Sequence, residues 1–462
     1  MNRHSVPFRH VCQTAFFRGI SLALVALLLF AASGCGGKKG SGKYPASGVI
    51  CQDVLTLPQN LNTYASAAGG NRTLAPAALQ AAAAAEQKDS LYRPWRMTEA
   101  SRWVKQSLDK NFSMKLENAY TDNRRPFPSS TWAALEENSN KRAYPSQEGK
   151  GITLRHTNLR AMPTSMPYYL DPDKPGEGFP FDYFQQTSLP MGTPLYICNI
   201  SKDESWILVE TALAAGWLPV ADVAGVDDAF VERWQHGGLA ALVRDRVAVG
   251  SSSEHAGTLL PLASGSAPSG LGNALSILFP VRGNDGKARA ESVSLAPGDA
   301  VAVPLALSPA NIALIGNGMM GQAYGWGGLM QLRDCSALTR DLYAPFGVWL
   351  PRNSARQAGV GRPIALTGMG NAEKEAVIVR EAVPFASLLW LRGHIAVYLG
   401  TYQGKPVMFH NMWGLRTRDS SGSCDGRAVV GKAVVTSLRP GSERPDLCSG
   451  LLDRIERAIV LP

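Results

Sequence analysis

The sequence predicts an α+β fold in which small β domains precede a domain of mixed helix and sheet. Three observations support this prediction. Short strand-like runs separated by Pro, Gly and Asp fill residues 151–224, a rhythm typical of a small β-barrel. A helix-like run begins at Cys335 and extends to Tyr343. Two alternating runs at 393–400 and 406–410 have the pattern of a β-hairpin.

The first 34 residues have the pattern of a secretory signal. Basic residues precede the apolar run 20–30, which is too short to remain as a membrane span. The sequence Ala-Ser-Gly-Cys at 32–35 resembles a bacterial lipobox, so we expect Cys35 to be lipidated and to anchor the protein to a membrane. Ordinary signal cleavage nearby is the alternative. Because no aspartate follows the cysteine, we expect the periplasmic face of the outer membrane in a Gram-negative cell envelope.

Residues 35–90 are predicted to form a tether with one possible helix. Residues 36–43 are rich in glycine and lysine, and residues 74–85 are dominated by alanine. From residue 91 to residue 150 we expect a helical segment, because aromatic and apolar residues between Tyr92 and Leu116 have helical spacing.

Two β-rich segments follow, at residues 151–228 and 229–306. In the first, strand-like runs cover residues 152–154, 195–198, 206–209 and 216–220. The second has clear turns but weaker motifs, and we expect it to form another small barrel. The remaining residues, 307–462, are assigned to one C-terminal domain.

Cys335 is the strongest candidate for a catalytic nucleophile. It lies between Asp334 and Ser336, residue types common at the cap and first turn of a helix. A helix N-terminus and a nearby imidazole both lower the pKa of a thiol, and the thiolate is the reactive form. A free cysteine taken alone is more often a small buried apolar residue. Two histidines downstream favour the catalytic interpretation.

His394 and His410 lie in the two strands of the predicted hairpin. A three-residue loop at 402–404, with Gly404 in the left-handed conformation, would place His394 opposite Met412 and both imidazoles on one face. A two-residue loop would place the imidazoles on opposite faces. We expect the three-residue loop, because one imidazole can then orient the other.

From about residue 313 onward the chain resembles the NlpC-type family of papain-like bacterial cell-wall cysteine peptidases. Five runs carry the resemblance in the order found in the family: YGWGG at 324–328, DCSAL at 334–338, LPRNSARQ at 350–357, GHIAVYLG at 393–400 and FHNMWG at 409–414. The resemblance implies a papain-like C-terminal domain with a catalytic triad. Cys335 would be the nucleophile, His394 the general base and acid, and His410 the residue that fixes the tautomer of His394.

The mechanism implied by the resemblance is attack of the thiolate on an amide, an acyl-enzyme and its hydrolysis. The family cleaves the peptide stem of peptidoglycan between γ-D-glutamate and a diamino acid such as meso-diaminopimelate. The N–H of Cys335 and the hydroxyl of Tyr324 are the expected oxyanion donors. Polar groups around the stem peptide in the family correspond here to Asp334, Ser336, Arg352 and Ser354.

One position departs from the family pattern. Relatives often carry an aspartate after the arginine of the LPR run, suited to the free amine of the stem's L-alanine, and this chain has Asn353 there. A neutral amide can accept a hydrogen bond from the amine but lacks the charge-assisted contribution. Whether the enzyme selects strictly for a free amine is therefore left open by the sequence.

The segments before the catalytic domain carry resemblances as well. Residues 151–228 resemble a bacterial SH3-like domain, and residues 91–150 resemble the stabilising segment of some of these peptidases. In relatives the SH3-like domain packs against the cleft, which makes three residues candidates for holding the ligand's amine: Asp182, Tyr183 and Glu210. Solvated barrel positions are the more common role for each of them.

Composition restricts the partners and cofactors. Of 7 cysteines, Cys424 and Cys448 bracket a loop region and could form a disulfide in an oxidising compartment. No Cys/His spacing predicts zinc and no motif predicts a nucleotide cofactor.

The net charge of +9 comes from scattered basic residues, which favours anionic cell wall or lipid headgroups over nucleic acid as partners. We expect a monomer.

The sequence therefore predicts a lipid-anchored γ-D-glutamyl-diamino acid endopeptidase acting on peptidoglycan stem peptides. Two alternatives are open. The same fold could support amidase or acyltransferase chemistry on another envelope substrate, or the protein could bind the wall without catalysis.

Overall fold

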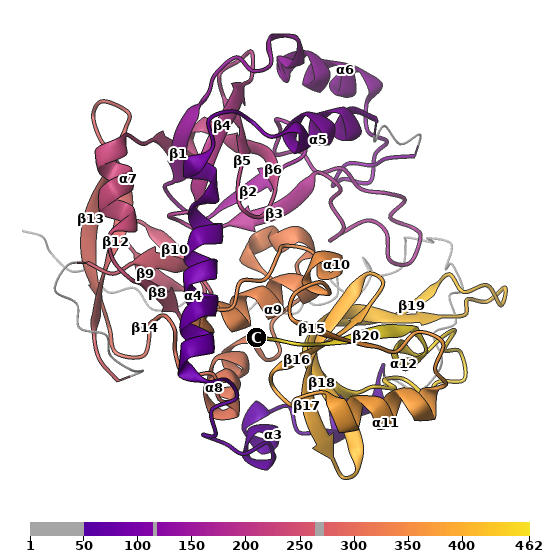
Figure 1. Ribbon diagram of the computed structural model, residues 1–462. Helices are drawn as coiled ribbons and strands as arrows, with labels where there is room; N and C mark the ends of the chain where they lie inside the picture. Colours follow the sequence, from indigo (N-terminus) through magenta and orange to yellow (C-terminus); the bar gives the residue numbers. More distant parts are fainter. Residues whose placement is uncertain (1–49, 114–117, 264–271) are drawn as a thin grey trace, which may run out of the picture. The chain divides into compact units, whose positions relative to one another are not determined.

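Helical and β segments alternate along the chain in the computed structural model, which describes residues 50–113, 118–263 and 272–462 (Figure 1). The compact unit that contains them extends from Ser47 to Pro462. The predicted leader and Cys35 lie outside the described residues. Among the helices of the described residues, none is both long and apolar enough to cross a membrane.

The N-terminal part is helical, and its helix α3 packs onto the C-terminal domain. Its elements are α2 (Gln52–Thr56), α3 (Leu61–Ala67), α4 (Ala77–Tyr92), η1 (Arg93–Arg96), α5 (Arg102–Ser113), α6 (Ser129–Asn138) and η2 (Lys141–Ala143). Tyr64 of α3 lies in the same buried core as Cys335. The side-chain amide of Gln59 donates to the carbonyl of Val435 at 3.0 Å and accepts from its N–H at 2.8 Å. The prediction of a tether is therefore wrong for residues 50–90.

Helix α4 docks through an amide instead of an apolar stripe, which is why its alanine-rich sequence did not indicate a packed helix. The buried Gln87 donates to the carbonyl of Ala344 at 2.9 Å. The helix also approaches Gly347 closely, where a Cβ would lie 2.6 Å from the Cβ of Ala84. Gly347 has a φ of +78°, so glycine is required there for two reasons.

The first β-rich segment forms a seven-stranded sheet in the order β3-β2-β6-β5-β4-β1-β7. Its elements are β1 (Gly149–Thr153), β2 (Thr157–Arg160), β3 (Gln185–Leu189), β4 (Pro194–Ile200), β5 (Trp206–Glu210), β6 (Ala215–Pro219), η3 (Val220–Asp222) and β7 (Val223–Gly225). Along β4, Leu195 and Ile197 enter the core on one face of the sheet. Tyr196 and Cys198 pack against α5 on the other face. The described strands do not close into a barrel, since β3 and β7 remain at the two edges.

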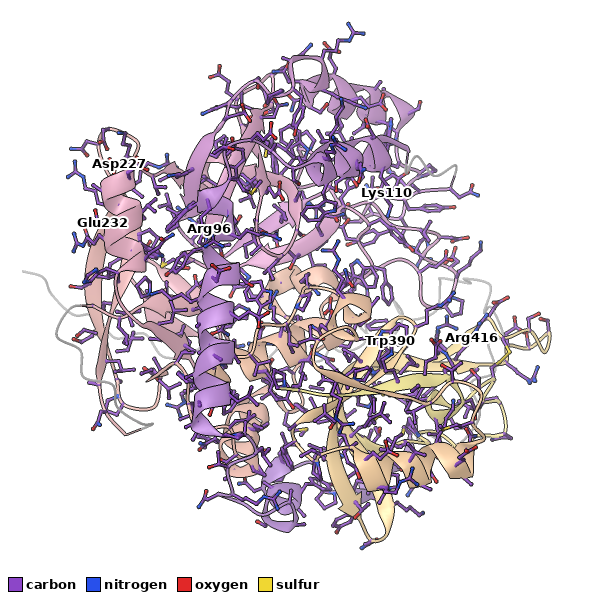
Figure 2. The ribbon with its side chains drawn as sticks, in the orientation of Figure 1. Arg96, Lys110, Asp227, Glu232, Trp390 and Arg416 are labelled. Atoms are coloured by element: carbon purple, nitrogen blue, oxygen red, sulfur yellow. A yellow bond between two sulfur atoms is a disulfide. The ribbon has the colours of Figure 1, made fainter. Side chains whose placement is uncertain are left out.

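The described strands of the second β-rich segment do not form a second barrel. They form three small sheets, β10-β9, β11-β8-β14 and β12-β13, because short strands are interrupted by turns. The elements are α7 (Asp228–Gln235), β8 (Leu239–Leu242), β9 (Val247–Val249), β10 (Ser252–Glu254), β11 (Leu259–Pro261), β12 (Leu275–Arg282), β13 (Ala288–Leu295) and β14 (Ala300–Ala302). Phe230 and Trp234 pack from the inner side of α7 into this core. Asp227, the N-cap of α7, and Glu232, within the helix, project outward from it (Figure 2).

The C-terminal domain is built on a six-stranded antiparallel sheet in the order β15-β20-β16-β17-β18-β19. Two sets of alternating side chains, such as Val397 and Tyr398 on β17, enter two different cores. One core includes α8 and α9, and the other includes α11 and α12. The elements are α8 (Pro309–Met319), η4 (Trp326–Gln331), α9 (Cys335–Tyr343), η5 (Ala344–Phe346), α10 (Ser354–Gln357), β15 (Arg362–Ala365), α11 (Asn371–Glu381), β16 (Ser387–Leu391), β17 (His394–Tyr402), β18 (Lys405–Thr417), β19 (Gly426–Ser437), α12 (Leu451–Arg454) and β20 (Ile455–Val460).

A disulfide joins Cys424 to Cys448, with 5.8 Å between their Cα atoms. It connects the loop between β18 and β19 to the loop before α12. The predicted pairing is confirmed. The other cysteines of the described residues, Cys51, Cys198 and Cys335, are free and buried.

Candidate active site

Helix α9 begins at Cys335, as the sequence predicts. Asp334 is its N-cap, and the carboxylate accepts a hydrogen bond from the N–H of Ala337 at 2.8 Å. The thiol-bearing residue is therefore the first residue of the helix, where its own N–H has no partner within the helix. Among the described residues no other group accepts from that N–H, so it is available to a developing oxyanion.

Asp334 and Arg352 form a bidentate ion pair that holds this helix start in place. The guanidinium donates to the two carboxylate oxygens at 3.1 and 2.7 Å. The same carboxylate accepts from the Ser336 hydroxyl at 3.0 Å and the Gly327 N–H at 3.2 Å. Burial opposes ionisation of Asp334, but the charge and hydrogen bonds of Arg352 hold its pKa below the usual range. Asp334, Ser336 and Arg352, predicted to surround the substrate, are thus engaged with one another.

The hairpin that carries the histidines differs from the prediction in its loop. Tyr402 pairs with Lys405, so the loop has two residues, Gln403 and Gly404, both with positive φ. A bulge between Tyr398 and Gly400 then shifts the register by one residue.

This one-residue shift reverses the consequence of the shorter loop. Val397 pairs with Phe409, and the same register continued along the strands brings His394 opposite Met412. Nε2 of His394 lies 2.7 Å from Nδ1 of His410. The three-residue loop was wrong, and the expected placement of the two imidazoles on one face is confirmed.

The proton positions of both imidazoles follow from Thr436 on β19. The Thr436 hydroxyl donates its only proton to the carbonyl of Ser437 at 2.8 Å. It can therefore only accept from Nε2 of His410, which lies 3.1 Å away. Nδ1 of His410 is then an acceptor for the Nε2–H of His394. The lone pair of His394 is left at Nδ1, the atom available to act as a base.

The thiol and the two imidazoles are all neutral at rest. Burial and the charge of Asp334 raise the pKa of Cys335 to about 12, although a hydrogen bond from the backbone of Ile395 lowers it in part. Burial and the charge of Arg454 lower the pKa of His394 to about 4, and burial together with His394 lowers that of His410 well below its usual value. The expected lowering of the thiol pKa is wrong, because full burial outweighs the helix terminus.

These directions define the chemistry that the pair can perform. The backbone of Ile395 hydrogen-bonds to the thiol sulfur, so the start of β17, which carries His394, lies against the start of α9. Because a lone thiolate and a lone imidazolium are both disfavoured by burial, transfer of the thiol proton to Nδ1 would be favoured only as the sulfur attacks a substrate. The arrangement fits general-base catalysis by His394 better than a permanent thiolate.

Tyr324 lies in an aromatic cluster at the site. Its ring centroid is 5.8 Å from Trp413 and 6.2 Å from Phe181, and Phe181 is also 5.2 Å from Trp326. Burial, followed by the charges of Cys335 and Asp334, raises the pKa of the Tyr324 hydroxyl, which therefore stays protonated as a donor. Phe181 comes from the SH3-like segment and was missed by the sequence, as was Trp413. The aromatic run at 179–184 that contains Phe181 was the available signal.

Asn353 and Ser354 mark the start of α10. Asn353 is its N-cap, with the side-chain oxygen accepting from the N–H of Arg356 at 2.9 Å. The exposed Asn353 therefore uses its oxygen within the chain, and Ser354, the first residue of the helix, is half-buried.

The SH3-like candidates for amine binding have other partners. Asp182 is buried, accepts from Arg160 at 2.6 Å and caps the N–H groups of Tyr168 and Phe184. Tyr183 is half-buried in the neighbouring aromatic core.

Glu210 is buried at the end of β5 and accepts from the N–H of Ser101, at the start of α5. These contacts place Glu210 with the N-terminal helices rather than with Cys335. Besides the ring contacts of Phe181, two SH3-like residues hydrogen-bond to the C-terminal domain: Gln185 donates to the Gly327 carbonyl at 3.1 Å, and Thr187 accepts from Arg352 at 2.6 Å.

Comparison with known proteins identifies the parts of the chain. Residues 321–429 match the model of the NlpC/P60 family. The C-terminal domain is an NlpC/P60 domain. Residues 167–219 match an SH3 domain of the SH3b1 type, and residues 22–144 match the N-terminal NLPC_P60 stabilising domain. No curated protein sequence matches the chain.

Solved structures share the fold around the NlpC/P60 domain. An NlpC/P60 endopeptidase from Photobacterium damselae subsp. piscicida superposes with a TM-score of 0.79 and 24% identity, covering 88% of this chain and 97% of that one. An NlpC/P60 family protein from Bacillus cereus ATCC 10987 gives a TM-score of 0.41 and 17% identity, covering 68% of this chain and all of that one. The first likeness shows a common architecture, and the second is too low to support an argument.

Thr436 can be tested as the residue that positions the histidines of the NlpC/P60 domain. Thr436→Val removes the acceptor for His410 Nε2–H, so His410 is expected to change tautomer and to stop accepting from His394. We expect kcat to fall at least tenfold, and by no more than the roughly 100- to 10,000-fold that general acid–base catalysis contributes, with KM nearly unchanged. Steady-state kinetics on a stem peptide measures both constants.

Thr436→Ser is the matched control, because it keeps the hydroxyl and removes only a methyl group. It should retain kcat within about threefold, since hydroxyl acceptors are equivalent. Equal losses of kcat in the Val and Ser variants, or a Val variant with normal kcat, would contradict the positioning role.

Proposed function

We propose that the protein is a cell-wall cysteine endopeptidase that cleaves the bond between γ-D-glutamate and meso-diaminopimelate in peptidoglycan stem peptides. The observation that carries the proposal is the position of Cys335 at the start of α9, with its thiol hydrogen-bonded to the backbone of Ile395, next in sequence to an imidazole whose free lone pair is set by His410 and Thr436. The NlpC/P60 domain supports a peptidase acting on the cell wall.

The chemistry proceeds through an acyl-enzyme. His394 Nδ1 takes the thiol proton as the sulfur of Cys335 attacks the γ-carbonyl of D-glutamate. The oxyanion accepts from the Cys335 N–H and the Tyr324 hydroxyl. His394 then gives the proton to the departing amine of the diamino acid. Water, deprotonated by His394, hydrolyses the thioester and restores the thiol.

A free N-terminal amine on the stem is not required in this proposal. The family's aspartate is replaced by Asn353, whose oxygen caps α10. Asp182, the buried acidic candidate in the SH3-like segment, is paired with Arg160. Neither group offers an uncommitted charge to an ammonium, so the charge-assisted contribution to selection is missing.

The test uses defined muropeptides and mass spectrometry of their products. L-Ala-γ-D-Glu-meso-diaminopimelate should yield L-Ala-γ-D-Glu and free diaminopimelate. The same stem attached to its glycan should be cleaved at the same bond with kcat/KM within roughly threefold, because no charged group rewards the free amine. A loss of more than about 100-fold on the glycan-linked stem would refute the amine proposal while leaving the bond specificity intact.

Two variants separate catalysis from folding. Cys335→Ala should abolish both products, whereas Cys198→Ala removes another buried free thiol, from β4 of the SH3-like segment, and should leave the rate unchanged. Release of intact stem peptide from the glycan would indicate an amidase instead. Wall binding without any product from the unmodified chain would indicate a binding protein.

We also propose that Cys35 carries lipid and holds the enzyme at the periplasmic face of the outer membrane. The support is the apolar run at 20–30 followed by the lipobox-like residues 32–35. Growth with an alkyne fatty acid should label the protein and place it in the outer-membrane fraction. Cys35→Ser should lose the label, and a Cys51→Ser control should keep it. Labelling that survives Cys35→Ser would contradict the anchor.

A further inference from the structure

A buried cluster of two histidines and a glutamate lies away from Cys335, where the SH3-like segment meets the segment 229–306. His156 precedes β2, Glu254 ends β10 and His255 follows it. One ligand-type atom from each residue lies within 4.8 Å of the others. Nδ1 of His156 is 3.8 Å from a Glu254 carboxylate oxygen, and the two imidazole centroids are 4.8 Å apart. None of the three is among the candidate catalytic residues Cys335, His394 and His410.

His156 is unusual because neither ring nitrogen has a hydrogen-bond partner, although its side chain is only 4% exposed. A buried polar group without a partner costs about 1–3 kcal/mol, and native structures contain few of them. The ring faces Glu254 and His255, so its unused nitrogens lie at the cluster.

Glu254 brings a negative charge into the same place. Its side chain is fully buried, and it accepts from the Ser252 hydroxyl at 2.6 Å and from the Met191 N–H at 3.2 Å. Among the described residues no lysine or arginine is paired with it. Such a carboxylate is usually neutralised by a cation.

We propose that His156, Glu254 and His255 bind a divalent transition-metal ion of the zinc class. Two imidazole nitrogens and one carboxylate oxygen are a donor set that suits Zn²⁺ and leaves a fourth position for water. The ion would give His156 the partner it lacks and would balance the charge of Glu254. Calcium and magnesium are disfavoured because they prefer oxygen ligands.

The geometry requires only a small contraction. Ligand atoms on one zinc ion lie about 3.3 Å apart, given zinc-to-nitrogen distances of about 2.0 to 2.1 Å. His156 can rotate toward the ion without breaking a hydrogen bond, because it makes none through its ring. His255 would bind the ion through Nδ1, whose contact with the Thr258 hydroxyl at 3.3 Å is long and easily exchanged, while Nε2 keeps its place beside Asp341 at 3.5 Å.

Asp341 connects the proposed site to the catalytic helix. It lies on α9, faces Nε2 of His255 and is held by Arg333 at 2.8 Å. A carboxylate behind a metal-bound histidine is the usual arrangement around zinc. The ion would thus join the SH3-like segment, the segment 229–306 and α9, and its role would be structural.

The sequence did not predict this site because its ligands lie far apart, one in the SH3-like segment and two in the segment 229–306. Glu254 and His255 are adjacent, but His156 precedes β2, so no short Cys/His spacing exists to be recognised. Only the packing of the two segments brings the three side chains together.

The experiment measures metal binding by the full chain, purified without a polyhistidine tag in detergent and carrying Cys335→Ala so that the catalytic thiol cannot chelate. After removal of metal, equilibrium dialysis against Zn²⁺ with elemental analysis should give one tightly bound ion per chain. Co²⁺ should produce visible absorption bands at the same stoichiometry, and Zn²⁺ should abolish them. Thermal unfolding should shift upward with Zn²⁺, as expected for a ligand that binds the folded state.

His156→Asn and Glu254→Gln should each weaken Zn²⁺ binding by more than about 100-fold, the upper range for loss of an outer-shell partner. His236→Asn, an exposed histidine near the end of α7, is the matched control and should bind like the parent. Circular dichroism establishes that each variant is folded. If the parent chain binds neither ion, the cluster is a His156–Glu254 ion pair only and the proposal fails, whatever the variants do. Equal Zn²⁺ affinity in parent and His156→Asn would also overturn it.

Discussion

The hydrogen-bond chain from Thr436 through His410 to His394 is the constraint on which the catalytic site depends. Its members come from the neighbouring strands β19, β18 and β17. Each neutral imidazole has one proton, so the direction of each hydrogen bond is set by the one before it. The Ser437 carbonyl fixes Thr436, Thr436 fixes His410, and His410 fixes His394. The register of the sheet therefore determines which nitrogen of His394 can accept the thiol proton.

The bulge on β17 is what makes this register possible. With a two-residue loop and regular pairing, His394 and His410 would face opposite sides, because side chains alternate along a strand. The pairing skips one residue before Gly400, whose φ of +98° is accessible to glycine and strained for other residues. Gly400 therefore helps to set the geometry of the active site, although it takes no part in the reaction.

A second interaction, the buried pair of Asp334 and Arg352, fixes the nucleophile relative to the SH3-like segment. The carboxylate caps α9 and holds the Gly327 turn, while the guanidinium reaches Thr187 on β3. Removing one member of a buried pair typically costs about 3–5 kcal/mol because the other charge is left unpaired. The groups that resemble substrate contacts in the sequence thus serve first to position Cys335.

The sequence predicted what depends on local pattern and missed what depends on packing. The helix start at Asp334 and Cys335, the strands of the SH3-like segment and the disulfide follow from residue types at short spacing. Burial of Glu210 and the pairing of Asp182 with Arg160 do not, since nothing in a single sequence shows which polar groups meet. Thr436 was missed for the same reason. The possible helix in the alanine-rich run is confirmed as α4, but its docking was missed because it depends on a glutamine.

The most direct test of the proton arrangement is two-bond ¹H–¹⁵N correlation NMR on histidine-labelled chain, with His394 assigned by comparison with His394→Gln. The account predicts a neutral His394 with its proton on Nε2 at neutral pH. Because burial holds its pKa near 4, well under the ordinary 6.5, the signal should keep that form as the pH falls to about 5. A proton on Nδ1, or an imidazolium at neutral pH, would contradict the central claim.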